Sequence, residues 1–259
     1  MQTMTDAPST DVPLSESSKD SSHCFAIVPA AGVGKRMGAS IPKQYLLLNN
    51  QTVLDATIER LLAHPLVKGV AVVISLDDQW WPTSRFANDE RVVTFDGGTE
   101  RYHSVFNALN ALRQNLHPQT RLLVHDAARP CVRHTDISRL IQQAGSSADG
   151  AILGCPVRDT MKQIDSRQHI HKTLDRDTMW HAFTPQLFQL SILYDAMHAA
   201  LRDNQPVTDE ASAMELAGFH PLMVEGHADN IKITRPEDLA LAAYYLEQQI
   251  IADESNQHA

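Results

Sequence analysis

The sequence predicts an α/β fold in which helices flank a mostly parallel, twisted sheet. Short apolar runs of strand length recur along the chain, and segments with helical spacing of apolar residues lie between them. Strands that alternate with helices in this way are typical of parallel sheets, because each helix returns the chain to the same edge. Polar motifs also follow three of the strands directly, which is where ligands bind in such sheets.

The elements are expected in the following order. Apolar runs predict strands at Phe25–Val28, Gly69–Ser75, Val92–Phe95, Arg121–His125, Gly150–Cys155 and Pro221–Glu225. Helical spacing appears at Val53–Leu62, Val105–Leu112 and Ile137–Ile141. Thr208–Ser212 is expected to begin a further amphipathic helix, residues 229–234 resemble a short strand, and Arg235–Asp238 opens the last helix with Pro236 at an early position.

Residues 157–180 interrupt this alternation. The segment contains apolar residues at Met161, Ile164, Ile170 and Leu174, and the polar run 165–168 lies midway between them. The pattern indicates a β-hairpin that protrudes from the domain as an arm. An exposed strand edge tends to pair with another chain, so we expect the arm to join two copies in a homodimer.

Composition suggests one domain with tails. Residues 1–22 are rich in Ser, Asp and Thr, and we expect them to be disordered. Residues 23–250 are expected to form a single domain, and the polar stretch 251–259 a frayed tail. Of the 259 residues, 43% are apolar and 20% charged, the balance of an ordinary globular protein.

Several partners and compartments are disfavoured. No apolar run approaches the roughly 20 residues that span a membrane, and no signal peptide is apparent. The cysteines Cys24, Cys131 and Cys155 are far apart, which is typical of reduced thiols in the cytoplasm. A net charge of −9 disfavours nonspecific binding to nucleic acid or an anionic membrane, and the 13 histidines lack metal-ligand spacing.

The loop after the first strand is the most informative motif. Gly32, Gly34 and Gly38 expose backbone N–H groups, and Lys35, Arg36 and Lys43 add positive charge. This combination suits a polyphosphate such as a nucleoside triphosphate. The spacing is one residue too long for a dinucleotide-binding fingerprint, and the phosphate-loop pattern is absent. A glycine-rich turn with solvated cations remains the structural alternative.

Two further motifs follow strands. Asp126 is expected at the tip of a central strand, where its carboxylate can bind Mg²⁺ or accept sugar hydroxyls, or simply cap the next turn. Arg129 suits phosphate recognition, with a salt bridge to Asp126 as the alternative. Gly97 and Gly98 resemble a loop that enters a helix with Thr99 as its N-cap, and the free N–H groups there could contact a base or phosphate.

Ser104 lies one helical turn further on and could point back to the same cleft. Asp229 and Lys232 lie three positions apart, so on a strand they would face opposite sides. A turn at Asp229 would be needed to bring both into one site.

Taken together, the motifs resemble the 2-C-methyl-D-erythritol 4-phosphate cytidylyltransferase family over residues 24 to about 248. The resemblance rests on Val28–Gly34, Arg36-Met37, Pro42–Tyr45, Asp96–Gly98, His125–Pro130, Pro156–Thr160, Thr184–Gln186, Thr208–Glu210 and Asp229–Thr234. It implies a Rossmann-like, nucleotidyltransferase-like fold. It also implies transfer of a cytidylyl group from CTP to a sugar-alcohol phosphate, with release of pyrophosphate, in the non-mevalonate isoprenoid route.

The resemblance assigns roles residue by residue. Arg36 and Lys43 would stabilise the transition state, and Arg176 and Lys232 would position the acceptor phosphate. CTP would be held by Ala30, Ala31, Gly32, Gly34, Gly98 and Ser104. The acceptor would be bound by Asp126, Arg129, Thr160 and Thr184, some of them from the partner's arm. A divalent cation, Mg²⁺ by analogy with phosphoryl transfer, completes the set, with Asp126 and Asp229 as candidate ligands.

Alternatives stay open at this point. The family often has an acidic residue at the position of Thr99, which leaves that contact in doubt. A ribitol 5-phosphate cytidylyltransferase would share the nucleotide loop. A non-catalytic nucleotide-sensing protein could share the fold, since fold alone does not determine function. A nicotinamide oxidoreductase is disfavoured by the glycine spacing.

Overall fold

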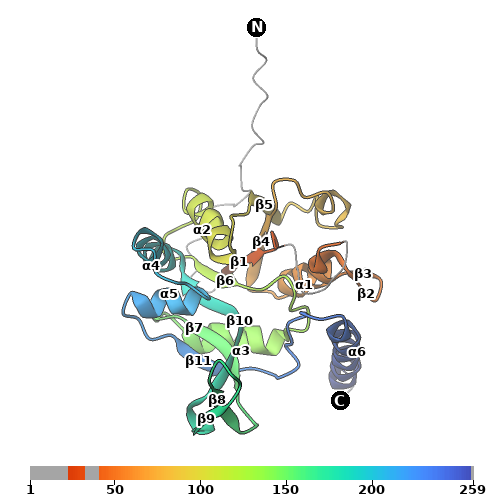
Figure 1. Cartoon of the computed structure of the whole chain (residues 1–259). Coiled ribbons are helices and arrows are strands. Elements are labelled where there is room, and N and C mark those ends of the chain that lie inside the picture. The colour runs from red at the N-terminus through yellow and green to blue at the C-terminus, as the bar shows by residue number, and fades with distance from the viewer. Residues whose placement is uncertain (1–22, 33–40, 258–259) are drawn as a thin grey trace.

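The computed structural model describes residues 23–32 and 41–257 (Figure 1), so the expected disordered segment 1–22 lies outside it. A seven-stranded sheet with the order β11-β7-β10-β6-β1-β4-β5 forms the centre. Its strands are β1 (Cys24–Pro29), β4 (Val67–Ile74), β5 (Val92–Asp96), β6 (Arg121–Val124), β7 (Ala151–Pro156), β10 (Trp180–Gln189) and β11 (Leu222–Glu225). The six expected strands are all present, with ends shifted slightly.

The sheet is mostly parallel, as predicted. β1 pairs in parallel with β4 and β6, β4 with β5, and β7 with β11. β10 is the exception: it lies antiparallel between β6 and β7 and was not predicted as a strand. The pairing with β7 shifts register between Ala182 and Gln186, around Pro185. Proline cannot donate to a strand ladder and concentrates at such irregularities, which is why the sequence does not resemble a central strand.

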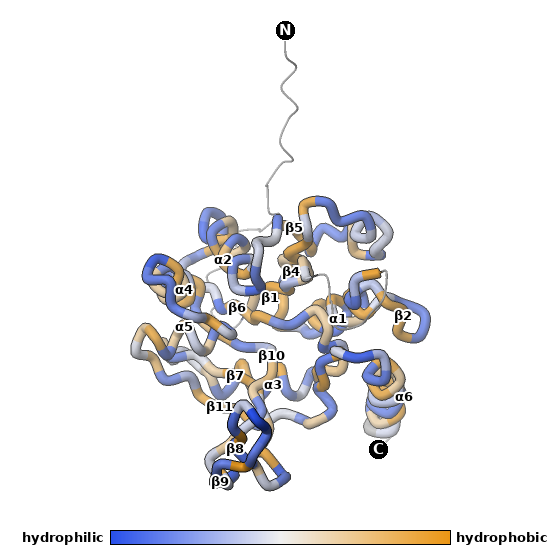
Figure 2. The backbone as a smooth tube through the Cα atoms, viewed as in Figure 1, coloured by the Kyte–Doolittle hydropathy of each residue, from blue (hydrophilic) through white to orange (hydrophobic). Residues whose placement is uncertain are grey.

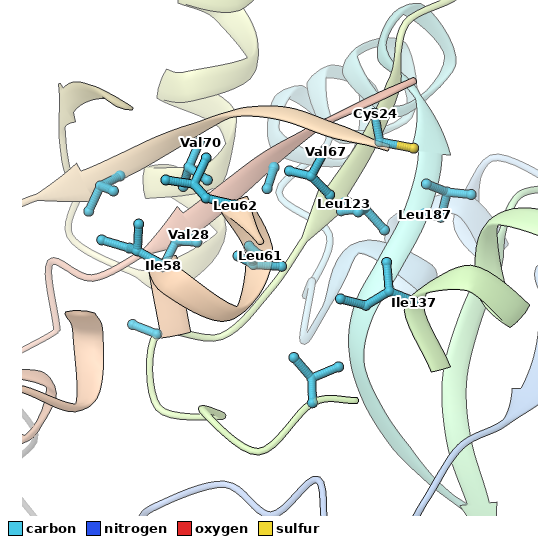
Figure 3. Packing of buried hydrophobic residues seen from close by; sticks show 14 of the residues in the cluster. Cys24, Val28, Ile58, Leu61, Leu62, Val67, Val70, Leu123, Ile137 and Leu187 are labelled. Atoms are coloured by element: carbon cyan, nitrogen blue, oxygen red, sulfur yellow. The ribbon is translucent and has the colours of Figure 1, made fainter. Parts of the chain in front are cut away.

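Helices cover both faces of the sheet, because alternate strand residues point to opposite sides. On β1, Ala26 and Val28 join one buried cluster, whereas Phe25 and Ile27 join the other. Figure 3 shows the first cluster, in which Ile58 packs near Val28. The first face is covered by α1 (Val53–Leu62) and α3 (His134–Ala144), and the second by α2 (Arg101–Leu112), α4 (Leu190–Arg202) and α5 (Glu210–Leu216).

A third, smaller cluster attaches the C-terminal part of the chain. It joins Leu48 of the short β2–β3 ladder (Leu47–Leu48 and Gln51–Thr52) to Ile233 and to Ala242 of α6 (Glu237–Gln257). Thus α6 extends into the segment that we expected to be a tail. Residues 229–234 do not form the expected strand. A turn at residues 228–229 precedes an irregular segment, in which Ile233 N–H donates to the Ala128 carbonyl at 2.8 Å.

The predicted hairpin is present and protrudes from the domain (Figure 1). β8 (Met161–Ile164) pairs antiparallel with β9 (Ile170–Leu174), and the short helix η4 (Arg176–Thr178) follows. Figure 2 shows that this arm is mainly hydrophilic with isolated hydrophobic positions. Those positions are exposed: Ile164 by 53% and Ile170 by 65%. Whether the arm joins two copies remains a prediction.

Candidate active site

The three polar motifs predicted at strand ends meet at one cavity. Its volume is about 570 Å³, and it lies at the carboxyl edge of β1, β5 and β6. The segment that follows β11 closes one side. The lining residues are Pro29, Ala30, Ala31, Gly32, Lys43, Gln44, Gly98, Thr99, Glu100, Arg101, Ser104, Asp126, Ala127, Ala128, Lys232 and Thr234.

Hydrogen bonds fix the loop after β1 at the cavity wall. Ala30 N–H donates to the Val73 carbonyl at 2.7 Å, and the Ala30 carbonyl accepts from Gln44 Nε2 at 2.5 Å. Ser75 Oγ donates to the Ala31 carbonyl at 2.9 Å. Among the described residues, none would contact a side chain placed at Gly32, and Gly32 lines the cavity. The candidate residues Gly34 and Arg36 lie outside the described residues.

The loop after β5 packs against the loop after β1 and requires its two glycines. A Cβ at Gly97 would collide with the Ala31 side chain, and one at Gly98 with the side chain of His103. Gly98 N–H donates to Ser104 Oγ at 3.0 Å, which holds the loop onto the first turn of α2.

The expected cap at this loop is wrong. Glu100, not Thr99, occupies the N-cap position of α2, and its side chain makes no cap hydrogen bond. Thr99 Oγ1 instead contacts Nδ1 of His103 at 2.9 Å. The Thr99 hydroxyl therefore bonds to a side chain in the first turn of α2 and does not cap the helix as its residue type suggested.

Asp126 is the electrostatic centre of the cavity. One carboxylate oxygen contacts Arg101 Nε at 2.9 Å; the other contacts Lys232 Nζ at 2.8 Å and Arg129 Nε at 3.5 Å. Burial alone would raise the pKa of Asp126, but the three positive charges outweigh burial and hold the pKa well below its usual range. The carboxylate is therefore ionised and keeps three cations together.

Arg101 and Glu210 are site residues that sequence reasoning missed. Arg101 lines the cavity and forms a two-pronged contact with Glu210, at 2.7 and 3.1 Å, in addition to its bond to Asp126. Glu210 is fully buried at the start of α5. These residues are 109 positions apart, and each is the first residue of its helix. Nothing local in the sequence signals their pairing.

The two candidate lysines converge on the same cavity. Lys43 Nζ donates to the Ile233 carbonyl at 2.9 Å, next to Lys232, which pairs with Asp126. The irregular segment that carries Lys232 thus supplies both a backbone anchor for Lys43 and a second ammonium group. A cavity with these cations and exposed backbone suits a polyphosphate.

The proposed metal ligands do not come together. Although a turn precedes Asn230, the Asp229 carboxylate faces Arg133, at 2.6 and 2.9 Å, and Gln249 at 3.1 Å. Both oxygens of Asp126 already contact cations. Within residues 23–32 and 41–257, no group of three acidic, His or Cys side chains could hold a metal ion. The described side chains thus do not fit a Mg²⁺ site made by the protein itself.

The remaining candidates lie around the cavity rather than on its wall. Arg129 and Thr184 are buried, with exposures of 8% and 5%, and belong to the interior next to Asp126. Arg176 and Thr160 lie at the base of the arm and are exposed; Arg176 donates to the Arg158 carbonyl at 2.7 Å. The structure does not bring these two arm residues into the cavity of their own chain.

Comparison with known proteins identifies one family. Residues 24–248 match the family described as "IspD: 2-C-methyl-D-erythritol 4-phosphate cytidylyltransferase". A protein of that name from Aliivibrio fischeri (strain MJ11) is 52% identical over 223 residues, which cover 86% of this chain and 93% of the relative. The counterpart from Vibrio cholerae is 52% identical over 221 residues, 85% of this chain and 95% of the relative.

Solved structures give the same result. The crystal structure of the Francisella tularensis 2-C-methyl-D-erythritol 4-phosphate cytidylyltransferase matches with a TM-score of 0.76 and 39% identity, covering 86% of this chain and all (100%) of the other. A crystal structure of a 4-diphosphocytidyl-2C-methyl-D-erythritol synthase matches with a TM-score of 0.75 and 36% identity, over 86% and 98% of the two chains.

Proposed function

Because the chain belongs to the 2-C-methyl-D-erythritol 4-phosphate cytidylyltransferase family, we propose that the cavity around Asp126 is its active site. The enzyme transfers the cytidylyl group of CTP to 2-C-methyl-D-erythritol 4-phosphate in isoprenoid biosynthesis, and pyrophosphate leaves. The observation that carries the site assignment is the convergence of Lys43, Lys232 and Arg101 on one cavity bounded by glycine-rich loops.

The triphosphate binds against the loops after β1 and β5. The Gly32 backbone and the first turn of α2 line the cavity and suit an anion. Lys43, which also lines the cavity, contacts the triphosphate and stabilises the charge that develops on the α-phosphate and on the leaving pyrophosphate. Arg36, which lies outside the described residues, shares this role in the proposal.

The acceptor needs alignment rather than a strong base. The phosphate of methylerythritol phosphate is largely dianionic near neutral pH, since its second pKa is about 6. Its oxygen attacks the α-phosphorus of CTP, the new P–O bond forms, and the bond to pyrophosphate breaks. Lys232 positions the attacking phosphate, and Asp126 holds Lys232 and Arg101 in place. Asp126 also accepts hydroxyl hydrogen bonds from the acceptor.

The proposal keeps a divalent cation, but its ligands come from the substrate phosphates rather than from Asp126 and Asp229. Mg²⁺ is commonly held by substrate phosphates with few protein ligands. Since Asp126 and Asp229 are engaged by basic side chains, we expect the ion to enter with CTP. No step above depends on a protein ligand to the ion.

We propose that the enzyme works as a homodimer in which the arm completes the partner's site. The arm exposes Met161, Ile164, Ile170 and Trp180 to solvent in the single chain, and apolar side chains on a protruding hairpin favour pairing with a second copy. Arg176 and Thr160 at its base would reach the acceptor across the interface. In this arrangement Arg176 positions the acceptor phosphate together with Lys232 from the other chain.

Mixing two inactive variants tests this arrangement. We expect Lys43→Ala and Arg176→Ala each to be nearly inactive alone, whereas mixed dimers contain one site with both residues intact. With random reassociation of a symmetric dimer, activity should return to about a quarter of the wild-type value. No recovery, with dimer mixing verified by differently tagged chains, would contradict action in trans.

Pyrophosphate release by the purified protein tests the reaction itself. We expect turnover with CTP, Mg²⁺ and 2-C-methyl-D-erythritol 4-phosphate, and none with ribitol 5-phosphate or without acceptor. Turnover with ribitol 5-phosphate alone would keep the mechanism and change the substrate. Binding of CTP without turnover on either acceptor would instead support a nucleotide-sensing role.

The cytoplasm is the proposed compartment. Cys24, Cys131 and Cys155 are free thiols, and burial raises the pKa of Cys24 to about 11 and of Cys131 to about 12, so both stay protonated. Among the described residues, the helices lack the combined length and apolar character needed to cross a bilayer. Reduced thiols support, without requiring, an intracellular location.

A further inference from the structure

A buried hydrogen-bond network lies directly behind the Asp126 carboxylate. His125, the residue after β6, is fully buried, and its ring contacts the Arg129 carbonyl through Nε2 at 3.0 Å. Its Nδ1 contacts Thr184 Oγ1 at 3.0 Å, and the same hydroxyl oxygen accepts from Asp126 N–H at 3.0 Å. Neither His125 nor Thr184 lines the cavity.

Chemistry fixes the direction of each bond in this network. A carbonyl can only accept, so His125 Nε2 carries a hydrogen. The ring is fully buried, and its nitrogens contact a carbonyl and a hydroxyl rather than a carboxylate, so the neutral ring fits this setting and Nδ1 is an acceptor. The Thr184 hydroxyl therefore donates to Nδ1 and accepts from Asp126 N–H. Its single hydrogen is used within the protein and is not available to a substrate.

A second set of bonds joins this network to Lys232. Asn230 Nδ2 donates to the Thr184 carbonyl at 2.8 Å, and Arg129 Nη1 donates to the Asn230 carbonyl at 2.6 Å. The chain then continues to Lys232, whose ammonium group contacts Asp126 at 2.8 Å. Residues from β6, β10 and the segment after β11 are thus tied together behind one ion pair.

We propose that His125 and Thr184 are positioning residues, which hold the backbone of Asp126 so that its carboxylate meets Lys232 and Arg101 without themselves contacting a substrate. The proposal rests on the function assigned to the cavity. It also replaces the acceptor-binding role that the family resemblance suggested for Thr184. The hydroxyl acts through Asp126, so its loss should affect turnover more than substrate affinity.

Thr184→Val tests the proposal, since valine keeps the shape and removes both hydrogen bonds. We expect kcat to fall about 10- to 100-fold, the range for a displaced reacting group, with the KM values for both substrates within about threefold of wild type. Thr184→Ser should restore kcat to within about threefold, because the hydroxyl is retained. A raised acceptor KM with normal kcat would assign the hydroxyl to substrate binding and overturn the proposal.

Coupling to Asp126 separates positioning from a general loss of structure. In an Asp126→Asn background, Thr184→Val should lower kcat less than twofold further, because the group that it positions is already altered. Full additivity of the two losses would contradict the proposal. His125→Asn, whose amide oxygen can accept from Thr184, should retain more activity than His125→Leu, and equal activity of these two variants would also contradict it.

The chain offers a matched control. His64 Nε2 contacts Ser138 Oγ at 2.9 Å in a second histidine–hydroxyl pair, away from the cavity, in which His64 is buried and Ser138 is exposed. Ser138→Ala should lower the thermal midpoint and leave kcat within about twofold of wild type. Equal losses of kcat in Ser138→Ala and Thr184→Val would show that the loss in Thr184→Val comes from lower stability alone, which would contradict the proposal. If wild-type protein shows no turnover, the function itself fails; if only the Thr184 variants behave like wild type, this inference fails alone.

Discussion

Lys43→Ala is expected to lower kcat by about 10²- to 10³-fold, the loss measured when one preorganised donor to a developing anion is removed. Lys43 lines the cavity, and its ammonium group is held by the Ile233 carbonyl at 2.9 Å, so it is oriented before substrate arrives. Negative charge accumulates on the leaving pyrophosphate in the transition state. A fixed cation therefore stabilises the transition state more than bound CTP.

Steady-state kinetics of pyrophosphate release, with each substrate varied, measure this prediction. The KM for CTP should rise less than kcat falls, since the interaction strengthens during the reaction. Lys68→Ala is the matched control, because Lys68 also donates to a backbone carbonyl, at 3.2 Å, but on the exposed surface. Normal kcat in Lys43→Ala with only a raised KM for CTP would assign Lys43 to ground-state binding.

The central strands could be predicted from the sequence because their surroundings are uniform. β1 and β4 are covered on both faces, so nearly every residue is apolar and the run is visible without knowledge of its neighbours. β10 was missed because it carries Thr184, Pro185 and Gln186. The ladder to β7 is irregular between Ala182 and Gln186, so the strand is recognisable only from its pairing with β6 and β7.

Only part of the candidate site could be predicted from the sequence. Asp126 could be placed at the cavity because the end of a parallel strand fixes its position. The partner Glu210 could not, because their connection through Arg101 depends on how α5 packs against the sheet. The surroundings of Asp229, a candidate metal ligand in the sequence, were hidden for a related reason: only the fold reveals that Arg133 reaches its carboxylate.

The charge arrangement around Asp126 explains how an acidic protein maintains a cationic cavity. The net charge is −9, yet Arg101, Arg129 and Lys232 converge on one carboxylate. Without substrate, Asp126 and Glu210 offset the mutual repulsion of these cations. Phosphate groups of the substrates then enter a site whose cations are already in position, so little rearrangement is needed.

Asp126→Asn should therefore destabilise the fold as well as the reaction. The substitution leaves Arg129, which is 8% exposed, and its neighbours without their common anion. Removing one partner of a buried ion pair costs about 3–5 kcal/mol of unfolding free energy. Urea unfolding followed by circular dichroism measures it, with Asp89→Asn as control. Asp89 pairs with Arg91 near the surface, at 2.7 Å, and exposed pairs contribute about 0–1 kcal/mol.

The pH dependence of the stability lost in Asp126→Asn shows whether that loss comes from the carboxylate charge. The pKa of Asp126 is held well below its usual range in the folded protein, whereas an aspartate in the unfolded chain titrates near about 4. As pH falls below about 4, the unfolded chain therefore takes up a proton at this residue while the folded chain does not. The stabilisation by Asp126 is fully present above that pH and declines below it.

The difference in unfolding free energy between wild type and Asp126→Asn should thus be constant from pH 8 to about pH 5 and shrink as the pH falls further. A difference that is unchanged down to about pH 3 would show that packing, rather than the carboxylate charge, accounts for the loss.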